Sequence, residues 1–168
     1  RLAADIVQHL AQRGIAVDYQ IMELSASLRA QQQATIHDAL AHTPHQHTFT
    51  WLDALPEQFN GVMIGNEVLD AMPVRLIGMN QGQWFERGVA VEHDQLVWRD
   101  RPTDTPLPMD ADWQGALRAA NGFYLSEIHE QQIAFMRSLE HSLQRGVILM
   151  FDSGFPAHGA SHPERNRG

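Results

Sequence analysis

Apolar positions recur along the chain with two periods, one typical of helices and the other of extended strands. Leu2, Ile6 and Leu10 share one helical face, whereas Val62 to Ile64 is the apolar run of a buried strand. The pattern predicts helices over 1–10, 25–40 and 127–145, and strands over 17–22, 48–51, 62–64 and 147–151. In the last of these helices, Ile133 is expected to face inward and Gly146 to cap the end. Strands that alternate with helices indicate an α/β fold with a mostly parallel sheet and helices on both faces.

The segment between Val74 and Arg99 has a different period. Its strand-like runs are separated by turn residues at Asn80–Gly82 and His93–Asp94, which is typical of antiparallel strands. We therefore predict one domain over 1–168 with an antiparallel insertion at about 74–112. The chain opens on a helix with no strand before it and closes on a polar segment, so we expect this domain to be truncated at both ends.

Acidic and amide side chains follow three of the predicted strands. Glu23 ends one strand, Asn66 and Glu67 end the next, and Asp152 ends the last. Ligands of open α/β sheets bind outside the carboxyl ends of the strands, where the turning chain presents its side chains. These residues are therefore expected to gather along one functional edge.

The turn that holds Asn66, Glu67 and Asp70 has three interpretations. Its carboxylates could bind a cationic or amine substrate, because ionised carboxylates accept paired N–H bonds from a guanidinium. They could instead serve as a general base with an orienting group. The structural alternative is a helix start, with Asn66 as N-cap and acidic residues in the first turn.

Glu23 has one functional and one structural interpretation. In a dinucleotide-type fold, an acidic residue at this strand end accepts hydrogen bonds from ribose hydroxyls. Alternatively, its carboxylate only favours the dipole of the following helix, for which Ser25 is the predicted N-cap. The glycine-rich turn that should precede the first helix is not in the chain, so spacing alone supports a nucleotide site weakly.

Composition narrows the classes of partner. The net charge of −8 argues against nucleic acid, which requires basic patches. The chain has no cysteine, which excludes thiol catalysis and disulfides within it. No apolar run approaches the about 20 residues that span a bilayer, and we expect a soluble intracellular protein. The histidines match no strong ligand spacing, so no metal site is predicted.

Five motifs together resemble one family. Tyr19–Arg29 with Gln32 is similar to the "(I/V)-E-x-S-x-x-L-R-x-x-Q" segment of the MidA-like family, and Asn66–Pro73 to its "N-E-x-x-D-A-x-P" signature. Further similarities are Trp84–Arg87 to "W-x-E-R", Phe151–Pro156 to "D-Y-G-(F/Y)", with Ser153 at the Tyr position, and His162–Arg165 to "H-P-x-R". These proteins are S-adenosylmethionine-dependent methyltransferases related to the mitochondrial complex I assembly protein arginine methyltransferase.

The resemblance implies a Rossmann-like class I methyltransferase that uses S-adenosylmethionine and methylates a protein arginine. The implied substrate is a protein, such as a respiratory-complex-like subunit. The expected location is cytoplasmic, or mitochondrial in a eukaryote, and the antiparallel insertion is a candidate homodimer or partner surface. The cofactor would contact Glu23, Asp53 and Asn66, with Asn66, Glu67 and Asp70 as catalytic residues, and Glu67, Asp70, Glu127 and Asp152 would bind substrate.

One alternative belongs to a different functional class. A methyltransferase-like fold without turnover could bind a basic protein partner through the acidic strand ends. The family's glycine-rich cofactor loop would lie before Arg1, so an intact loop in the full-length protein would separate the two hypotheses.

Overall fold

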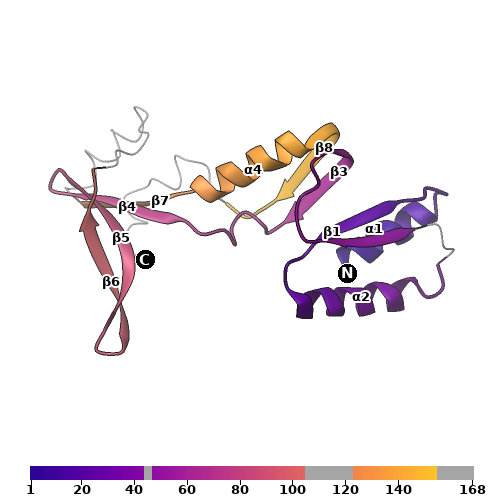
Figure 1. Cartoon of the computed structure of the whole chain (residues 1–168), viewed down its shortest axis with the longest axis horizontal. Helices are drawn as coiled ribbons and strands as arrows, with labels where there is room; N and C mark the ends of the chain where they lie inside the picture. Colours follow the sequence, from indigo (N-terminus) through magenta and orange to yellow (C-terminus); the bar gives the residue numbers. More distant parts are fainter. Residues whose placement is uncertain (44–46, 105–122, 155–168) are drawn as a thin grey trace. The chain divides into compact units, whose positions relative to one another are not determined.

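The computed structural model describes residues 1–43, 47–104 and 123–154. The chain divides into two compact units, Arg1–Gln58 and Phe59–Gly168, and each is described by itself. Figure 1 labels the elements of both. Within the described ranges, no helix combines the length and the apolar character needed to cross a membrane.

The first unit is a parallel strand pair with two helices. Its elements are α1 (Leu2–Ala11), β1 (Asp18–Met22), α2 (Ala26–Leu40) and β2 (Thr48–Leu52), with β1 and β2 in register from Asp18↔Thr48 to Met22↔Leu52. Val7 of α1 and Ile36 and Leu40 of α2 are buried, and they pack against one face of the pair, which carries Tyr19, Ile21, Phe49 and Trp51. The opposite face, with Gln20, Met22, Thr48 and Thr50, is exposed. In this unit both helices therefore contribute to the core on the same face, contrary to the expectation of helices on both faces.

The second unit contains another parallel pair, β3 (Phe59–Asn66) with β8 (Leu143–Phe151), and helix α4 (Glu130–Ser142) leads directly into β8. Gly61 and Gly146 face each other in this pair at φ of 148° and 145°, a region that L side chains rarely adopt. The sequence predicted that Gly146 caps a helix, but Gly146 lies inside β8. A Cβ at Gly146 would overlap the Gly61 carbonyl, so the glycine permits close approach of the two strands.

The rest of the second unit is an antiparallel sheet in the order β6-β5-β4-β7. Its strands are β4 (Arg75–Asn80), β5 (Gln83–Glu92), β6 (Gln95–Pro102) and β7 (Phe123–Ile128). The predicted turns are confirmed: Gln81–Gly82 and His93–Asp94 all have positive φ, as two-residue hairpin loops of the primed type require. Ile77, Phe85 and Tyr124 are buried in this sheet.

The architecture confirms an α/β chain and corrects two details. The described residues form two parallel pairs and one antiparallel sheet, not one mostly parallel sheet. The antiparallel insertion at about 74–112 was incomplete, because β7 joins it from 123–128 through pairing with β4. Residues 105–112 of that predicted insertion lie outside the described residues.

Candidate functional site

The acidic stretch after β3 forms a tight turn and not a helix. Asn66 is the last residue of β3, and the backbone N–H of Glu67 donates to the carbonyl of Phe151 at 2.8 Å. Glu67 then takes a positive φ of 50°, which is uncommon for a residue other than glycine. The structural alternative, in which Asn66 caps a helix, is therefore wrong. The positive φ lies at the point where the chain leaves the strand and presents polar side chains, as is common for backbone at functional sites.

Asp152 fastens this turn to the neighbouring strand β8. Its Oδ1 accepts hydrogen bonds from the backbone N–H of Leu69 at 2.8 Å and of Asp70 at 3.3 Å. From α4, the Gln132 side chain donates to the carbonyl of Leu69 at 2.7 Å. Both backbone polar groups of Leu69 are thus held by side chains from other elements. The turn is positioned by contacts that do not use the carboxylates of Glu67 and Asp70.

Three carboxylates meet at this turn. One carboxylate oxygen from each of Glu67, Asp70 and Asp152 lies within 4.8 Å of the other two, and the Ser153 hydroxyl donates to Glu67 Oε1 at 3.2 Å. The Oδ2 atom of Asp152 is buried and has no hydrogen-bond partner within the described part of the chain. Three like charges at this spacing repel one another, and a bound cation would relieve the repulsion. Such a group suits a guanidinium and could also ligate a metal ion, so the sequence prediction of no metal site stays a prediction.

In the first unit, the carboxylate of Glu23 is oriented by a hydrogen bond to each oxygen. The backbone N–H of Ser25 donates to Oε1 at 2.9 Å, and Gln32 Nε2 donates to Oε2 at 3.0 Å. Ser25 also caps α2, because its side chain accepts from the N–H of Leu28. The Oε1 atom of Gln32 accepts from Trp51 Nε1 at 2.9 Å. The predicted N-cap is confirmed, and the carboxylate of Glu23 supports the start of α2.

Arg29 ties together the carboxyl ends of β1 and β2. Its guanidinium donates to the carbonyl of Glu23 at 3.0 and 2.6 Å and to the carbonyl of Leu52 at 3.0 Å. It also pairs with Asp53 Oδ1 at 2.7 Å, where the Asp53 side chain is 88% exposed. The polar residues of the segment 23–32 therefore form one network across the two strand ends. A side chain as exposed as Asp53 remains open to a ligand.

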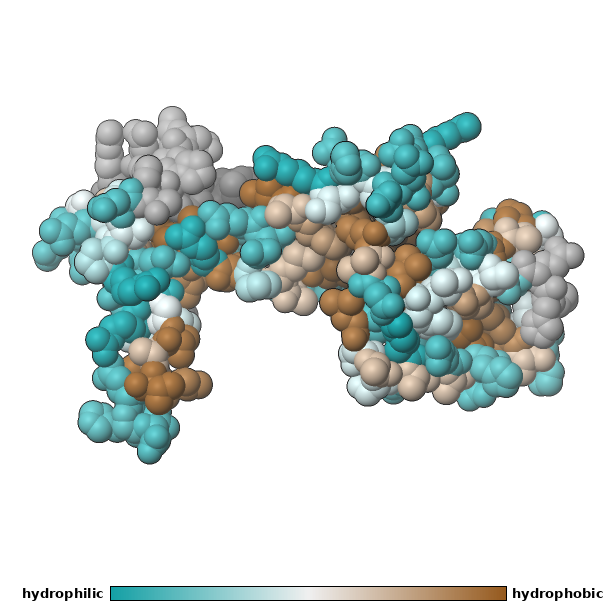
Figure 2. Space-filling view, viewed as in Figure 1, coloured by the Kyte–Doolittle hydropathy of each residue, from teal (hydrophilic) through white to brown (hydrophobic). Residues whose placement is uncertain are grey.

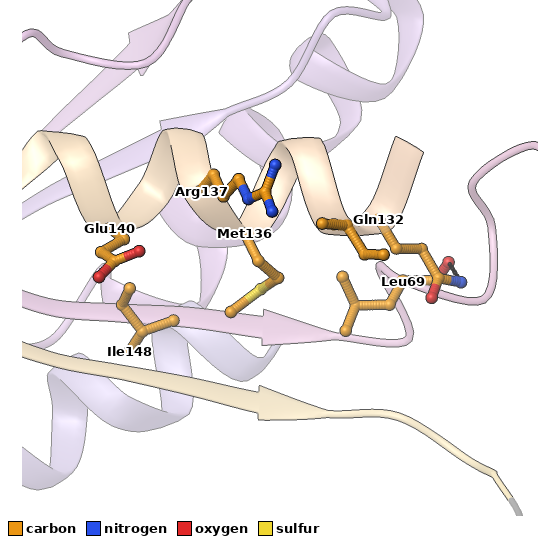
Figure 3. Close-up of a pocket in the computed structure, with 7 residues that line it drawn as sticks. Leu69, Gln132, Met136, Arg137, Glu140 and Ile148 are labelled. Carbon is orange, nitrogen blue, oxygen red and sulfur yellow. Dashed lines mark hydrogen bonds between the residues drawn. The ribbon is translucent and has the colours of Figure 1, made fainter. Parts of the chain in front are cut away.

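A shallow groove lies beside the turn in the second unit. It has a volume of about 530 Å³ and is lined by Leu69, Gln132, Ile133, Met136, Arg137, Glu140 and Ile148. Figure 3 shows Leu69, Met136 and Ile148 approaching each other between α4 and the strands. The sequence placed Ile133 inward on its helix, but this side chain is 52% exposed and lines the groove.

Comparison with known protein families decides the class of this chain. A family model described as "Putative S-adenosyl-L-methionine-dependent methyltransferase" matches residues 1–168. The chain belongs to this methyltransferase family. Among curated proteins, none matches the sequence significantly. The predicted class and its cofactor, S-adenosylmethionine, are therefore confirmed at the level of the family.

Two solved structures resemble this methyltransferase chain. A COG1565 superfamily protein from Burkholderia thailandensis, bound to S-adenosyl-homocysteine, is 38% identical, with a TM-score of 0.81 over 99% of this chain and 42% of that one. A native structure of an uncharacterized COG1565 superfamily protein from the same organism is 39% identical, with a TM-score of 0.80 over 99% of this chain and 44% of that one. The chain thus spans less than half the length of both relatives.

The structure brings some of the predicted methyltransferase residues together. Glu67, Asp70 and Asp152 cluster, with Asn66 at the adjoining strand end, and Glu23 and Asp53 share the network of Arg29. That the two sets lie along one edge stays a prediction, because each unit is described by itself. The segments 155–156 and 162–165 of the resemblance lie outside the described residues.

Glu127 needs a correction. The sequence placed it at the start of a helix, but Glu127 lies on β7, where it pairs with Leu76 of β4, and α4 begins at Glu130. The Glu127 carboxylate is 57% exposed and lies 3.8 Å from His129. Its assignment to substrate binding has no support in these contacts.

Sequence reasoning missed two residues that shape the turn, Gln132 and Ser153. Gln132 lies on the side of α4 that meets Leu69. A polar residue on the packed side of a predicted helix could have indicated that its side chain binds a backbone group. At Ser153, only the absence of the family's tyrosine was considered, whereas the Ser153 hydroxyl donates a hydrogen bond to Glu67.

Proposed function

We propose that this chain forms part of an S-adenosylmethionine-dependent methyltransferase of the MidA type that methylates an arginine guanidinium of a protein. The observation that carries the cofactor and the reaction class is the 38% identity, over 99% of this chain, to a relative bound to S-adenosyl-homocysteine. The acceptor is inferred separately, from the carboxylates of Glu67, Asp70 and Asp152.

Glu23 is the residue that we assign to the ribose of the cofactor. A carboxylate offers about four acceptor positions. The hydrogen bonds from Ser25 and Gln32 use one on each oxygen of Glu23 and leave the others for two ribose hydroxyls. Asp53, held at one oxygen by Arg29, is the second candidate. Asn66 is a neutral amide at the strand end, which can bind cofactor or acceptor without adding charge.

The acidic turn fits the needs of a guanidinium acceptor. Bound S-adenosylmethionine supplies a methyl group already activated by its sulfonium. The protein must then position and desolvate the nucleophilic nitrogen. Glu67 and Asp70 would accept N–H bonds from the guanidinium and fix its plane. As the new N–C bond forms and the C–S bond breaks, the nitrogen loses a proton to one of these carboxylates or to water.

Two experiments on the full-length protein test the proposal. Isothermal titration with S-adenosylmethionine should show binding, and Glu23→Gln should weaken it by roughly tenfold, the effect of losing about 1.4 kcal/mol of hydrogen bonding to a charged group. Absence of heat at millimolar cofactor would reject the enzyme and favour a binding module without turnover.

The second experiment follows transfer of radiolabelled methyl to arginine-containing protein substrates, including respiratory-complex subunits. Glu67→Gln should lower transfer by about tenfold or more while cofactor affinity stays within about twofold, because one charged contact to the acceptor is lost. The matched control is Glu57→Gln, at an exposed glutamate of the first unit. Unchanged transfer in Glu67→Gln would remove Glu67 from the acceptor site.

A further inference from the structure

The outer half of the β5–β6 hairpin extends beyond the rest of its sheet. β4 pairs with β5 only over 83–87, whereas β5 and β6 stay paired out to Glu92↔Gln95. Beyond residue 87, the hairpin is a two-stranded ribbon within the described ranges. Such a ribbon is marginally stable in water on its own. Because five further residue pairs, Gly88↔Arg99 to Glu92↔Gln95, lack a third strand, a partner packed on one face would stabilise this part of the hairpin.

One face of this ribbon carries four large apolar side chains. Val89 pairs with Trp98 and Val91 with Leu96, so all four point to the same side. They are among the most exposed large apolar side chains of the described chain, at 59% for Val89, 69% for Val91, 78% for Leu96 and 64% for Trp98. Figure 2 shows a brown patch toward the end of the hairpin, the part of the chain to which Val89, Val91 and Leu96 belong. On the opposite face, Ala90 and Val97 are half-buried.

We propose that these four residues, which we call the hairpin stripe, pack against the hairpin stripe of a second copy of this chain. A two-by-two block of apolar side chains on a flat ribbon can meet its own copy about a two-fold axis, and isologous contacts of this kind are the commonest in homo-oligomers. This inference goes beyond methyl transfer and does not depend on it.

The charges around the hairpin stripe favour a second copy over a charged partner. The hairpin 83–102 holds three arginines and four acidic residues, and ion pairs neutralise most of them: Arg87 with Asp100, Arg99 with Glu92 and Arg101 with Glu86. Two such surfaces repel each other little. An anionic membrane surface would require an excess of basic residues beside the apolar ones, which this hairpin does not have.

The size of the hairpin stripe suits the centre of an interface. The four side chains offer roughly 400 Å² of apolar surface per copy, about half of the 800 Å² per partner in a standard complex. The ion pair of Arg87 with Asp100 lies on the same face next to Val89 and Trp98, and it can supply part of the polar rim. Trp98 is the expected anchor, because tryptophan is enriched among residues that dominate binding energy.

Sedimentation velocity of the full-length protein tests the proposal. Wild type should dimerise between about 1 and 100 micromolar, the range expected of a modest interface. Leu96→Glu should raise the dissociation constant by at least about 100-fold, because it places an unpaired charge at the centre of the contact. Gln95→Glu, which adds the same charge beside the stripe, is the matched control and should stay dimeric. A monomeric wild type, as expected if another segment of the same polypeptide covers the stripe, would overturn the inference.

A cross-linking experiment keeps the test decisive if the glutamate variant folds poorly. In a background without other cysteines, Leu96→Cys should form a disulfide between two copies under oxidation, because equivalent residues meet near a two-fold axis. Asp94→Cys, at the exposed hairpin turn, is the control and should link much more slowly. Equal linking of both variants, or dimers that Leu96→Glu leaves intact, would place the interface elsewhere.

Discussion

Substitution of Asp152 tests whether its hydrogen bonds to Leu69 and Asp70 hold the acidic turn in place. Asp152→Ala removes the acceptor of two backbone N–H groups, at 2.8 Å from Leu69 and 3.3 Å from Asp70. A hydrogen bond to a charged group contributes about 1.5–3 kcal/mol, and the longer bond contributes less. Against this, the variant relieves repulsion with Glu67 and Asp70, which at this spacing in a solvated site is about 1 kcal/mol. The hydrogen bonds outweigh the repulsion, so we expect a net loss of about 1–2 kcal/mol.

The matched variant is Asp152→Asn, which keeps an oxygen at the position of Oδ1. It should retain the bond to Leu69 in weaker, neutral form and also relieve the repulsion, so we expect a stability loss of less than about 1 kcal/mol. Urea unfolding of the full-length variants measures this difference. Methyl-transfer kinetics should follow the same order, with Ala losing roughly tenfold or more in kcat/KM for the acceptor and Asn within about threefold of wild type.

The result that would refute this reasoning is an Asn variant as impaired in transfer as the Ala variant, with stability close to wild type. The negative charge of Asp152 would then matter more than its hydrogen bonds to the turn. Asp152 would in that case contact the cationic acceptor directly, through the buried Oδ2 atom that has no partner in the described ranges. Cofactor affinity, which should not change in either variant, shows whether the effect is confined to the acceptor side.

Three further predictions concern the framework around the candidate site. Arg29→Ala should destabilise the first unit by about 2–3 kcal/mol, because it leaves two strand-end carbonyls without a charged donor, and urea unfolding measures the loss. Gly146→Ala should abolish or strongly weaken folding, seen by circular dichroism, because a Cβ would overlap the Gly61 carbonyl. The Arg87 guanidinium lowers the pKa of Asp100 below its usual 3.8, so the pair stabilises the fold above that pH and the contribution is lost as the pH falls through the folded pKa. The fall in urea midpoint between pH 7 and pH 3 should therefore be smaller in Asp100→Asn.

Each of these framework predictions can fail in a specific way. An Arg29→Ala variant as stable as wild type would mean that water satisfies the carbonyls. A well-folded Gly146→Ala would show that β3 and β8 can separate at that point. An unchanged pH dependence in Asp100→Asn would mean that other carboxylates, such as Glu86, whose pKa Arg75 lowers, dominate acid unfolding.

The sequence predicted the helices, strands and turns that are determined by residues close together in the chain. Apolar spacing located α1, α2 and the apolar parts of β3 and β8, and turn chemistry located His93–Asp94. The strand β7 was missed because its pairing partner β4 lies about 50 residues away, and its last residues were assigned to the helix that follows. Gly146 was misread for a similar reason, because the backbone that leaves no room for a Cβ there is that of Gly61, across the strand pair. Such long-range partners leave no local pattern.

In the candidate site, too, contacts between residues near in sequence could be predicted, and contacts between distant residues could not. Ser25 was predicted as a cap because its bond to Leu28 spans three residues. Arg29 and Gln32 lie three apart on the same helix and both reach Glu23, so their spacing carries the information. By contrast, the contact of Asp152 with Leu69 spans 83 residues, and only the folded chain reveals it.

In the two parallel strand pairs, side chains of opposite charge bind the backbone polar groups at the carboxyl ends of the strands. At the carboxyl end of a parallel pair the ladder stops, and the departing backbone leaves polar groups that need partners. In the first unit the cation Arg29 donates to the carbonyls of Glu23 and Leu52, and in the second the anion Asp152 accepts from the amides of Leu69 and Asp70. In the first unit, Arg29 fixes the backbone, and the carboxylates assigned to the cofactor are those of Glu23 and Asp53. In the second unit, Asp152 is part of the acidic cluster but also holds the backbone through Oδ1, whereas Glu67 and Asp70 leave that task to it. Substitutions of Arg29 and Asp152 should therefore lower stability and activity together, whereas substitutions of Glu67 and Asp70 should lower activity alone.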